Sequence, residues 1–280
     1  MNNKITAKGL FHVHSEYSAD SNLKLIDIKR NSNGFNFFIL CEHEYGLTRK
    51  KFADFLNDCK SHSNKGCLFI PGIEIKIGNS HLLLIGNISF EDYLHLKNKK
   101  RVNKKDTLLV WAHPEENEIK EISSFLPFLD GIELWNLLHD GTFVFPVKKL
   151  RLLRRLKKSN ENIKAFIGSD LHNFEFFKKQ SLVLSVKRLA IEDVINKIKK
   201  GEFFSESGNF KVLGNGSVEF KGKPIAKLPH LTLLSCLYKL YRRLIQLVIN
   251  ISGGILDFLG IKGKVRKRLI IIFRNSFGDY

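Results

Sequence analysis

Short apolar runs alternate with longer amphipathic runs over the first 220 residues of the chain. The short runs predict strands at 10–13, 37–41, 67–70, 81–85, 108–112, 132–135, 165–167 and 182–185. Apolar residues at spacings of three and four predict helices at 25–31, 50–60, 90–99, 119–125, 147–158 and 191–200. Repeated strand-then-helix units indicate an α/β protein with a parallel sheet, and about seven such units favour a closed or nearly closed barrel.

Histidines and carboxylates gather at the ends of these expected strands. Those that follow or end a strand are His12, His14, His43, Glu74, His113, Asp170 and His172. Barrel enzymes place their chemistry at the carboxyl ends of the strands, so this placement indicates one shared site. His81 is the exception, because it opens its strand.

The spacing of these residues predicts a metal site. Alternate residues of an extended chain point the same way, so His12 and His14 can present two imidazoles to one ion, and Asp170 and His172 repeat the arrangement. Imidazole and carboxylate suit zinc, iron and manganese. A single His-x-His is most often coincidence, but six of the ten histidines lie at expected strand boundaries beside carboxylates. The four outside this pattern are His62, His95, His139 and His230.

Seven segments, in this order, resemble the polymerase and histidinol phosphatase (PHP) family: FHVHSEYSAD, LCEHEYG, PGIEI, HLLLIG, WAHPE, GIELWN and GSDLHN. The resemblance covers residue 9 to about residue 210. It implies a distorted (β/α)7 TIM-like barrel and a phosphoric ester hydrolase with two or three divalent ions, which would be Mn, Zn or Fe. The nine ligands that it implies are His12, His14, Asp20, His43, Glu74, His81, His113, Asp170 and His172.

The resemblance also divides these ligands among three ions. One ion would be held by His12, His14, Glu74 and Asp170, and Glu74 would bridge to a second ion held by His81 and His113. The third would be held by Asp20, His43 and His172. The catalytic residues would be Glu74, His113, Asp170 and Asp20. Outside the ligands, supporting roles or plain packing and capping roles are open for Glu42, Tyr45, Glu133 and Asn136.

Three functions remain open from these residues. The first is hydrolysis of a small phosphomonoester or nucleotide by a metal-activated water. The second is a 3′–5′ exonuclease or oligonucleotide hydrolase, and the third is a non-catalytic, membrane-associated metal-binding module. Some relatives of the PHP family have lost ligands, but all nine positions are filled here, which favours catalysis.

Positive charge divides the chain in two. The formal net charge is +18, and residues 221–280 contribute +10 of it, from 12 of the 46 Lys and Arg against 2 of the 28 acids. We therefore expect a PHP-like domain at 1–220 and a basic amphipathic C-terminal extension at 221–280. Apolar residues recur every three or four positions from 231, opposite a basic face. Residues 231–273 are therefore expected to bind an anionic membrane or to pack on the barrel; phosphate and nucleic acid are the other anionic partners.

The location follows from what the sequence lacks. Residues 1–10 have no apolar run of signal-peptide length, and the longest uncharged stretch of the extension, 244–256, is 13 residues against the roughly 20 needed to span a bilayer. Cys41, Cys59, Cys67 and Cys236 form no close-spaced pair. We expect a cytoplasmic protein, peripheral on the inner face of the membrane if the extension binds lipid.

Overall fold

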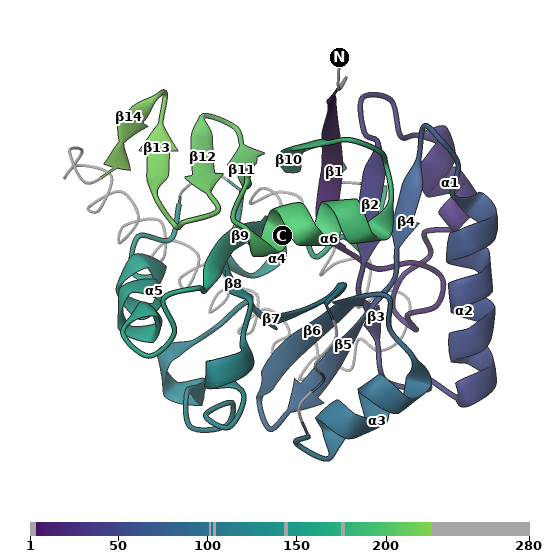
Figure 1. Ribbon diagram of the computed structural model, residues 1–280, viewed down its shortest axis with the longest axis horizontal. Helices are drawn as coiled ribbons and strands as arrows, with labels where there is room; N and C mark the ends of the chain where they lie inside the picture. The colour runs from purple at the N-terminus through teal and green to yellow at the C-terminus, as the bar shows by residue number, and fades with distance from the viewer. Residues whose placement is uncertain (1–3, 101, 103–104, 143–144, 175–176, 226–280) are drawn as a thin grey trace, which may run out of the picture. The chain divides into compact units, whose positions relative to one another are not determined.

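Two sheets organise the computed structural model, which describes residues 4–100, 102, 105–142, 145–174 and 177–225 (Figure 1). In spatial order, the eight strands of the first sheet are β14 (Lys223–Pro224), β13 (Val218–Phe220), β12 (Phe210–Leu213), β11 (Phe203–Ser207), β10 (Ser181–Val186), β1 (Ile5–Val13), β2 (Phe37–Leu40) and β4 (Leu68–Ile70). The six strands of the second are β3 (Glu42–His43), β5 (Gly72–Ile77), β6 (Ser80–Gly86), β7 (Thr107–Ala112), β8 (Gly131–Asn136) and β9 (Lys164–Gly168).

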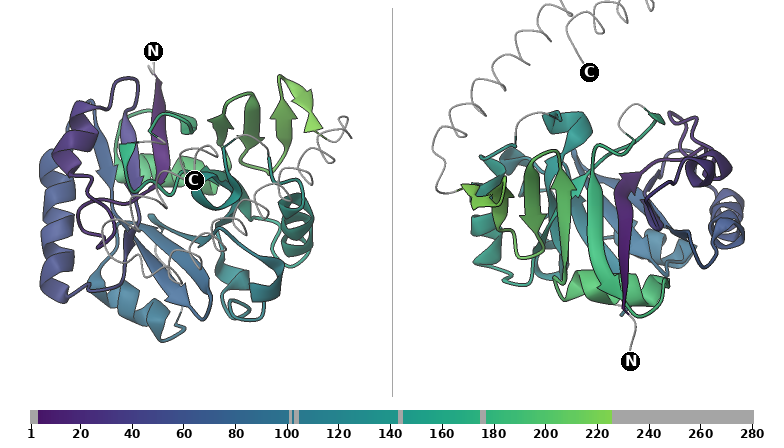
Figure 2. Two further views of the ribbon diagram at one scale, coloured as in Figure 1. Left: turned by 180° about the vertical axis from the view of Figure 1, so that it is seen from behind. Right: turned by 90° about the horizontal axis from the view of Figure 1, so that it is seen from above.

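The strand directions are mixed. Parallel pairs are β1–β2, β2–β4, β3–β5, β7–β8 and β8–β9. Strand β6 runs antiparallel to both β5 and β7, because the chain turns back at once through Gly78 and Asn79 instead of crossing over through a helix. From β10 to β14 all pairs are antiparallel, and Figure 2 shows these green strands continuing the sheet away from β1.

The two sheets meet at the ends of β1, β2 and β4. The chain passes from β2 to β3 through Cys41 and from β4 to β5 through Pro71. Beside β1, the His14 amide donates to the Leu171 carbonyl (2.9 Å) and the Leu171 amide donates to the His12 carbonyl (3.2 Å). The expected α/β class is confirmed, whereas the strands form two joined sheets rather than one closed barrel of repeated βα units.

Helices cover the sheets on the outside. They are α1 (Leu25–Arg30), α2 (Arg49–His62), α3 (Phe90–Lys97), α4 (Leu137–Asp140), α5 (Lys149–Lys157) and α6 (Ile191–Lys199). The apolar face of α6 buries Val194, Ile195 and Ile198 in the same core cluster as Ile85 and Leu108. Since Ile85 and Leu108 lie at the far ends of their strands from His81 and Ala112, α6 covers the end of the core away from the predicted site (Figure 1).

The predicted helix at 119–125 is wrong. Its amides bond three residues back, as from Phe125 to the Ile122 carbonyl (2.8 Å), and the flanking 3-10 helices are η1 (Glu116–Glu118) and η2 (Leu126–Phe128). Pro127, in the first turn of η2, has no amide hydrogen to continue an α-helical ladder.

The end of the described chain bears on the predicted extension. The first sheet runs on through β14, so its last hairpin passes the boundary expected at residue 221. Residues 226–280, with the predicted membrane-binding segment, lie outside the described residues, and the division into two domains stays a prediction. None of the helices in the described ranges is long and apolar enough to cross a membrane.

Candidate metal centre

The nine side chains predicted as ligands converge at one end of the two sheets. Eight of them fall into groups whose donor atoms lie within 4.8 Å of one another, and Asp20 adjoins one of these groups. His81 joins them although it opens its strand, because β6 is antiparallel and His81 therefore pairs with Ala112, the last residue of β7.

The innermost group is completely buried. His12 Nε2 lies 3.1 Å from His14 Nε2 and 3.3 Å from Glu74 Oε2, and His14 Nε2 lies 3.2 Å from Asp170 Oδ1. Donors about 2.1 Å from a common ion lie about 3.0–3.4 Å apart in octahedral or tetrahedral geometry. The spacing of these four donors therefore fits one ion.

Glu74 connects this group to a second one. Its Oε1 atom lies 2.8 Å from His81 Nδ1 and 3.0 Å from His113 Nε2. Its Oε2 atom faces His12, His14 and His43 at 3.2–3.4 Å. Because the two oxygens of one carboxylate face different sets of imidazoles, Glu74 has the geometry of a bridging ligand.

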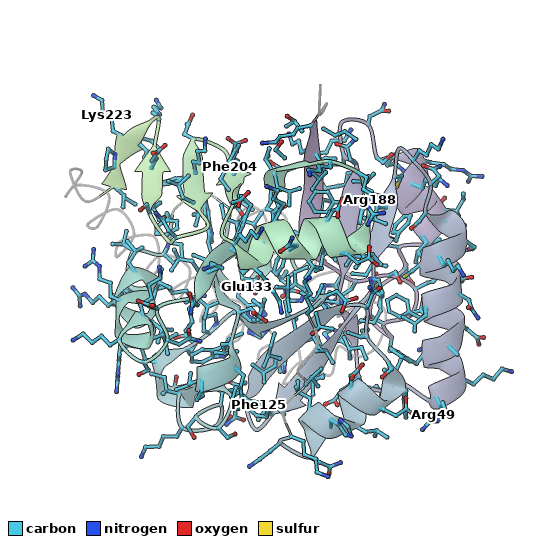
Figure 3. The ribbon with its side chains drawn as sticks, in the orientation of Figure 1. Arg49, Phe125, Glu133, Arg188, Phe204 and Lys223 are labelled. Carbon is cyan, nitrogen blue, oxygen red and sulfur yellow. The ribbon has the colours of Figure 1, made fainter. Side chains whose placement is uncertain are left out.

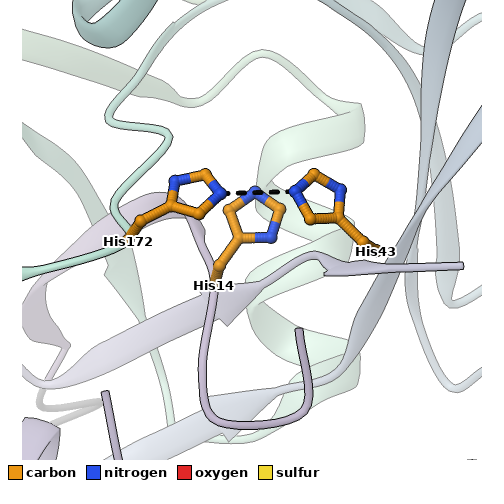
Figure 4. Close-up of side chains that lie close together, drawn as sticks. All are labelled: His14, His43 and His172. Atoms are coloured by element: carbon orange, nitrogen blue, oxygen red, sulfur yellow. Dashed lines mark hydrogen bonds between the residues drawn. The ribbon is translucent and has the colours of Figure 1, made fainter. Parts of the chain in front are cut away.

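A third group lies nearer the surface (Figure 4). His43 Nε2 and His172 Nε2 are 3.3 Å apart, and the ring of His14 lies between these residues with its centroid 4.2 Å from each of theirs. The Oδ2 atom of Asp20 lies 3.3 Å from His43 Nε2 and 3.4 Å from His172 Nε2. Asp20 is the most exposed member, so this group opens to water.

Hydrogen-bond partners at Nδ1 orient three of the imidazoles. The Oε1 atom of the buried Glu133, labelled in the middle of Figure 3, lies 2.7 Å from His12 Nδ1, which leaves Nε2 directed at the ligand group. His14 Nδ1 lies 3.2 Å from the Ser18 hydroxyl, which donates to Glu42, and His172 Nδ1 lies 3.0 Å from the Asp170 carbonyl. Each contact holds a proton on Nδ1, so Nε2 is the nitrogen that faces the group and can bind an ion.

Three of the ligands have left-handed backbone. The φ angles are 66° at His12, 28° at His113 and 52° at Asp170. Residues other than glycine rarely adopt such angles, which cost about 1–3 kcal/mol and cluster at functional sites. At His12 the conformation coincides with a shift of register between β1 and β2. His12 and His14 therefore converge through a bulge, and not through the regular extended alternation that the His-x-His spacing predicts.

Burial and charge act in opposite directions on the inner group. Burial lowers the pKa of His12, but Glu133, Asp170 and Glu74 outweigh it and hold the pKa well above its usual value. Burial lowers the pKa of His14 to about 4. Burial would raise the pKa values of Glu74 and Asp170, yet the surrounding histidines hold both well below their usual range. The carboxylates are thus kept charged, as ligands of a cation must be.

The ion-pair partners of the buried carboxylates also fit a metal site. Within the described part of the chain, the ion pairs of Glu74, Asp170 and Glu133 are all with histidines. A buried set of carboxylates and imidazoles, with no thiolate among its donors, suits zinc, iron or manganese.

The structure changes the interpretation of His139 and describes the contacts of residues whose roles the sequence left open. His139, placed outside the pattern, reaches the site: it stacks on His113 with centroids 4.1 Å apart and lies 3.4 Å from Asp170 Oδ2. Glu133 and Asn136 have supporting contacts, since Asn136 Nδ2 donates to Glu133 (2.9 Å) and to Asp170 (3.2 Å). Tyr45, by contrast, is 80% exposed.

Comparison with solved structures finds several that superpose on this chain. A two-domain protein from Bacteroides vulgatus containing a predicted PHP-like metal-dependent phosphoesterase superposes with a TM-score of 0.51 at 16% identity, over 75% of this chain and 67% of that chain. PsfC from Pseudomonas syringae gives a TM-score of 0.48 at 15% identity, over 83% and 97% of the two chains. The lesion-specific endonuclease PfuEndoQ from Pyrococcus furiosus gives 0.43 at 16%, over 70% and 56%.

Comparison with protein-family models and with curated protein sequences finds no match. The similarity to the Bacteroides vulgatus protein shows the fold, and at that level the resemblance to the PHP family is confirmed.

Proposed function

We propose that this chain is a phosphoesterase that hydrolyses a small phosphomonoester or nucleotide with two or three divalent ions. The observation that carries this proposal is the division of Glu74, whose two oxygens face separate groups of imidazoles at 2.8–3.4 Å. A carboxylate divided in this way can bridge two adjacent ions, and sites with two ions catalyse phosphoester hydrolysis.

Three donor sets would hold the ions. The inner set is His12, His14, Glu74 and Asp170, the second is Glu74, His81 and His113, and the outer set is Asp20, His43 and His172 with His14 beside it. Bound there, divalent ions would supply Lewis acidity that activates a water and neutralises phosphoryl oxygens. In this proposal Glu74, His113, Asp170 and Asp20 are the catalytic residues of the site.

The protein's own residues would keep this site in its working geometry. Glu133 accepts hydrogen bonds from His12 Nδ1 (2.7 Å) and from the His113 backbone amide (2.8 Å), so one buried carboxylate orients two ligands. Asn136 links Glu133 to Asp170. Because the ligands are fixed before an ion or substrate arrives, little reorganisation accompanies catalysis.

Exposed apolar and aromatic residues beside site histidines in the sequence support an organic phosphoester as substrate. Tyr45, Leu138 and Phe174 are exposed, and each lies within two residues of a site histidine along the chain. Apolar and aromatic side chains at the mouth of an ion site can contact the base or another organic part of a substrate while the ions bind its phosphate.

Elemental analysis and a substrate panel test the proposal together. The purified protein should carry more than one equivalent of manganese, iron or zinc, and the manganese-loaded protein should release phosphate from phosphomonoesters or nucleotides. Less than half an equivalent after reconstitution would contradict the cluster. Metal binding without turnover of any phosphomonoester, dinucleotide or oligonucleotide would leave a non-catalytic metal-binding module.

A nuclease is the second candidate, because α5 carries a basic surface. Arg151, Arg154, Arg155 and Lys158 are exposed on and just after this helix, while Leu152, Leu153 and Leu156 are buried on its other face. Exposed Arg and Lys bind the phosphate backbone of nucleic acids whatever the base sequence. Shortening of single-stranded oligonucleotides in the same panel would favour this candidate over the phosphomonoesterase.

A further inference from the structure

Asp170 presents its two oxygens to different neighbours. Its Oδ1 atom lies 3.2 Å from His14 Nε2 and 3.7 Å from His12 Nε2, within the inner donor set. Its Oδ2 atom lies 3.4 Å from His139 Nε2 and accepts from Asn136 Nδ2 at 3.2 Å. Asp170 therefore divides between two sets of donors, as Glu74 does, and the second set includes a histidine that the nine predicted ligands omit.

His139 is aligned with His113 on this side of the site. The two rings stack with centroids 4.1 Å apart and planes 21° from parallel. One donor atom from each of His113, His139 and Asp170 lies within 4.8 Å of the other two. An imidazole pair and a carboxylate at this spacing form a donor set of the kind that binds zinc or manganese.

The backbone around His139 is held in place. The Asn136 side chain caps α4 by accepting from the His139 amide (3.0 Å). The Asp140 carboxylate accepts hydrogen bonds from the Asn136 backbone amide (2.9 Å) and from Lys149 Nζ (2.7 Å). The His139 side chain is nevertheless 51% exposed, so an ion bound there would have open positions for water or substrate.

His113 belongs to this set and also to the second set. Its Nε2 atom lies 3.0 Å from Glu74 Oε1 and 3.2 Å from His81 Nδ1. A neutral imidazole has one lone pair, so His113 can serve one ion at a time. The two sets are therefore alternatives.

We propose that His113, His139 and Asp170 form an alternative, solvent-facing position for the ion that His113 otherwise holds with Glu74 and His81. This inference rests on the proposed metal centre. It adds a tenth side chain to the site, and it predicts two positions for one ion without a further equivalent of metal.

Metal content of four variants tests this. The variants are His81→Ala, His139→Ala, the double variant His81→Ala/His139→Ala, and the control double variant His81→Ala/His95→Ala. His95 is an exposed histidine in the last turn of α3. Each is dialysed against the same saturating Mn²⁺, and bound metal is measured by elemental analysis. Circular dichroism of the metal-free proteins shows which variants fold.

We expect each single variant and the His95 control to keep the number of equivalents of the unmodified protein, and His81→Ala/His139→Ala to lose about one. Loss of that equivalent in His81→Ala alone, or its retention in His81→Ala/His139→Ala, would overturn the alternative position. If that double variant does not fold, His81→Asn/His139→Gln preserves polar volume and is judged by the same counts. Unmodified protein that binds no Mn²⁺ would instead refute the metal centre itself.

Discussion

At the scale of single residues, Glu74 connects the inner and second donor sets, and its charge is the property to test. Replacement of Glu74 by Gln nearly keeps the volume and leaves one carbonyl oxygen, but it removes the anion that faces five histidines. We expect hydrolysis to fall by at least about a hundredfold while the protein still folds. Steady-state kinetics at saturating Mn²⁺ measure the loss.

The matched control for this change is Glu91→Gln. Glu91 is exposed and pairs with Arg49 at the surface, so its charge contributes little to stability. Hydrolysis should be unchanged in this control. Activity of Glu74→Gln equal to that of the unmodified protein would exclude a bridging role for Glu74.

Gly168 provides a second test at this scale, because it makes room for Glu133. A Cβ atom at Gly168 would lie 1.8 Å from Glu133 Oε1, the atom that contacts His12 Nδ1. Gly168→Ala should therefore displace Glu133 and weaken metal binding by about 10–100-fold, the effect typical of losing a partner of a metal ligand. Isothermal titration with Mn²⁺ measures this affinity.

Gly66→Ala is the control for Gly168→Ala. At Gly66 the nearest atom to an added Cβ is Asn64 Oδ1, at an ordinary contact distance of 3.7 Å. Its metal affinity should match that of the unmodified protein. Equal affinity in Gly168→Ala would mean that Glu133 does not orient His12.

The sequence predicted the nine ligands better than it predicted the neighbouring residues and the backbone conformation around them. Nine metal-competent side chains in family order were visible in the sequence, and the structure brings them together. His139 could not be found in the same way, because its approach to Asp170 depends on the short helix α4 after β8. In the sequence, His139 does not share the spacing that marks the other ligands. The left-handed backbone of His12 was equally hidden, because it depends on register between strands.

At the scale of elements, Glu42 fixes the segment that carries Asp20. Its carboxylate accepts from the Ser15 amide and hydroxyl and from the Ser18 hydroxyl, at 2.6–3.1 Å. Burial raises the pKa of Glu42, while the bonds from Ser15 and Ser18 lower it. Glu42→Ala would leave these buried donors unpaired, so we expect the free energy of unfolding to fall by about 3 kcal/mol.

Urea unfolding of the metal-free protein measures that loss. Glu42→Gln keeps an acceptor oxygen at nearly the same place, so its loss should be smaller than that of Glu42→Ala. If Glu42→Ala unfolds at the same urea concentration as the unmodified protein, the contacts of Glu42 with Ser15 and Ser18 do not stabilise the fold.

The elements that the sequence predicted are continuous apolar strands, such as β2, β7 and β8, and helices with one buried face, such as α6. Each strand expected from the sequence has a counterpart, and so do the helices except 119–125. Strand direction was not predictable, because the Gly78–Asn79 turn decides it, and this turn makes β6 antiparallel. The hairpins from β11 to β14 were missed because their strands have at most five residues, too few for a clear apolar run, although Gly208-Asn209 and Asn215-Gly216 are turn signals between them.

At the scale of the whole molecule, the described fold contains the complete donor sets. A protein ending at residue 225 retains β14 and all nine predicted ligands, whereas one ending at residue 221 would lose the pairing of β14 with β13. We expect residues 1–225 to fold and to hydrolyse a small phosphoester at the rate of the full chain. Thermal unfolding and kinetics of the two proteins check this.

Liposome flotation separates the role of the basic extension from catalysis. The full chain should float with anionic vesicles at low salt and be released as salt rises, since basic charge is screened over about 10 Å at 0.1 M salt. Residues 1–225 should remain unbound under the same conditions. If the full chain also stays unbound at low salt, the extension binds another partner or packs on the domain.

The left-handed backbone at His12, His113 and Asp170 also bears on how such a site would decay over evolutionary time. In a descendant that no longer needs ions, selection for the ligands would end while the strain of these three positions remained. Glycine and asparagine relieve that strain, whereas valine and isoleucine increase it. Homologues that have lost the ions should thus carry glycine or asparagine at the positions of His12, His113 and Asp170. At the position of His81, whose backbone lies in a regular strand, the replacements should show no such preference.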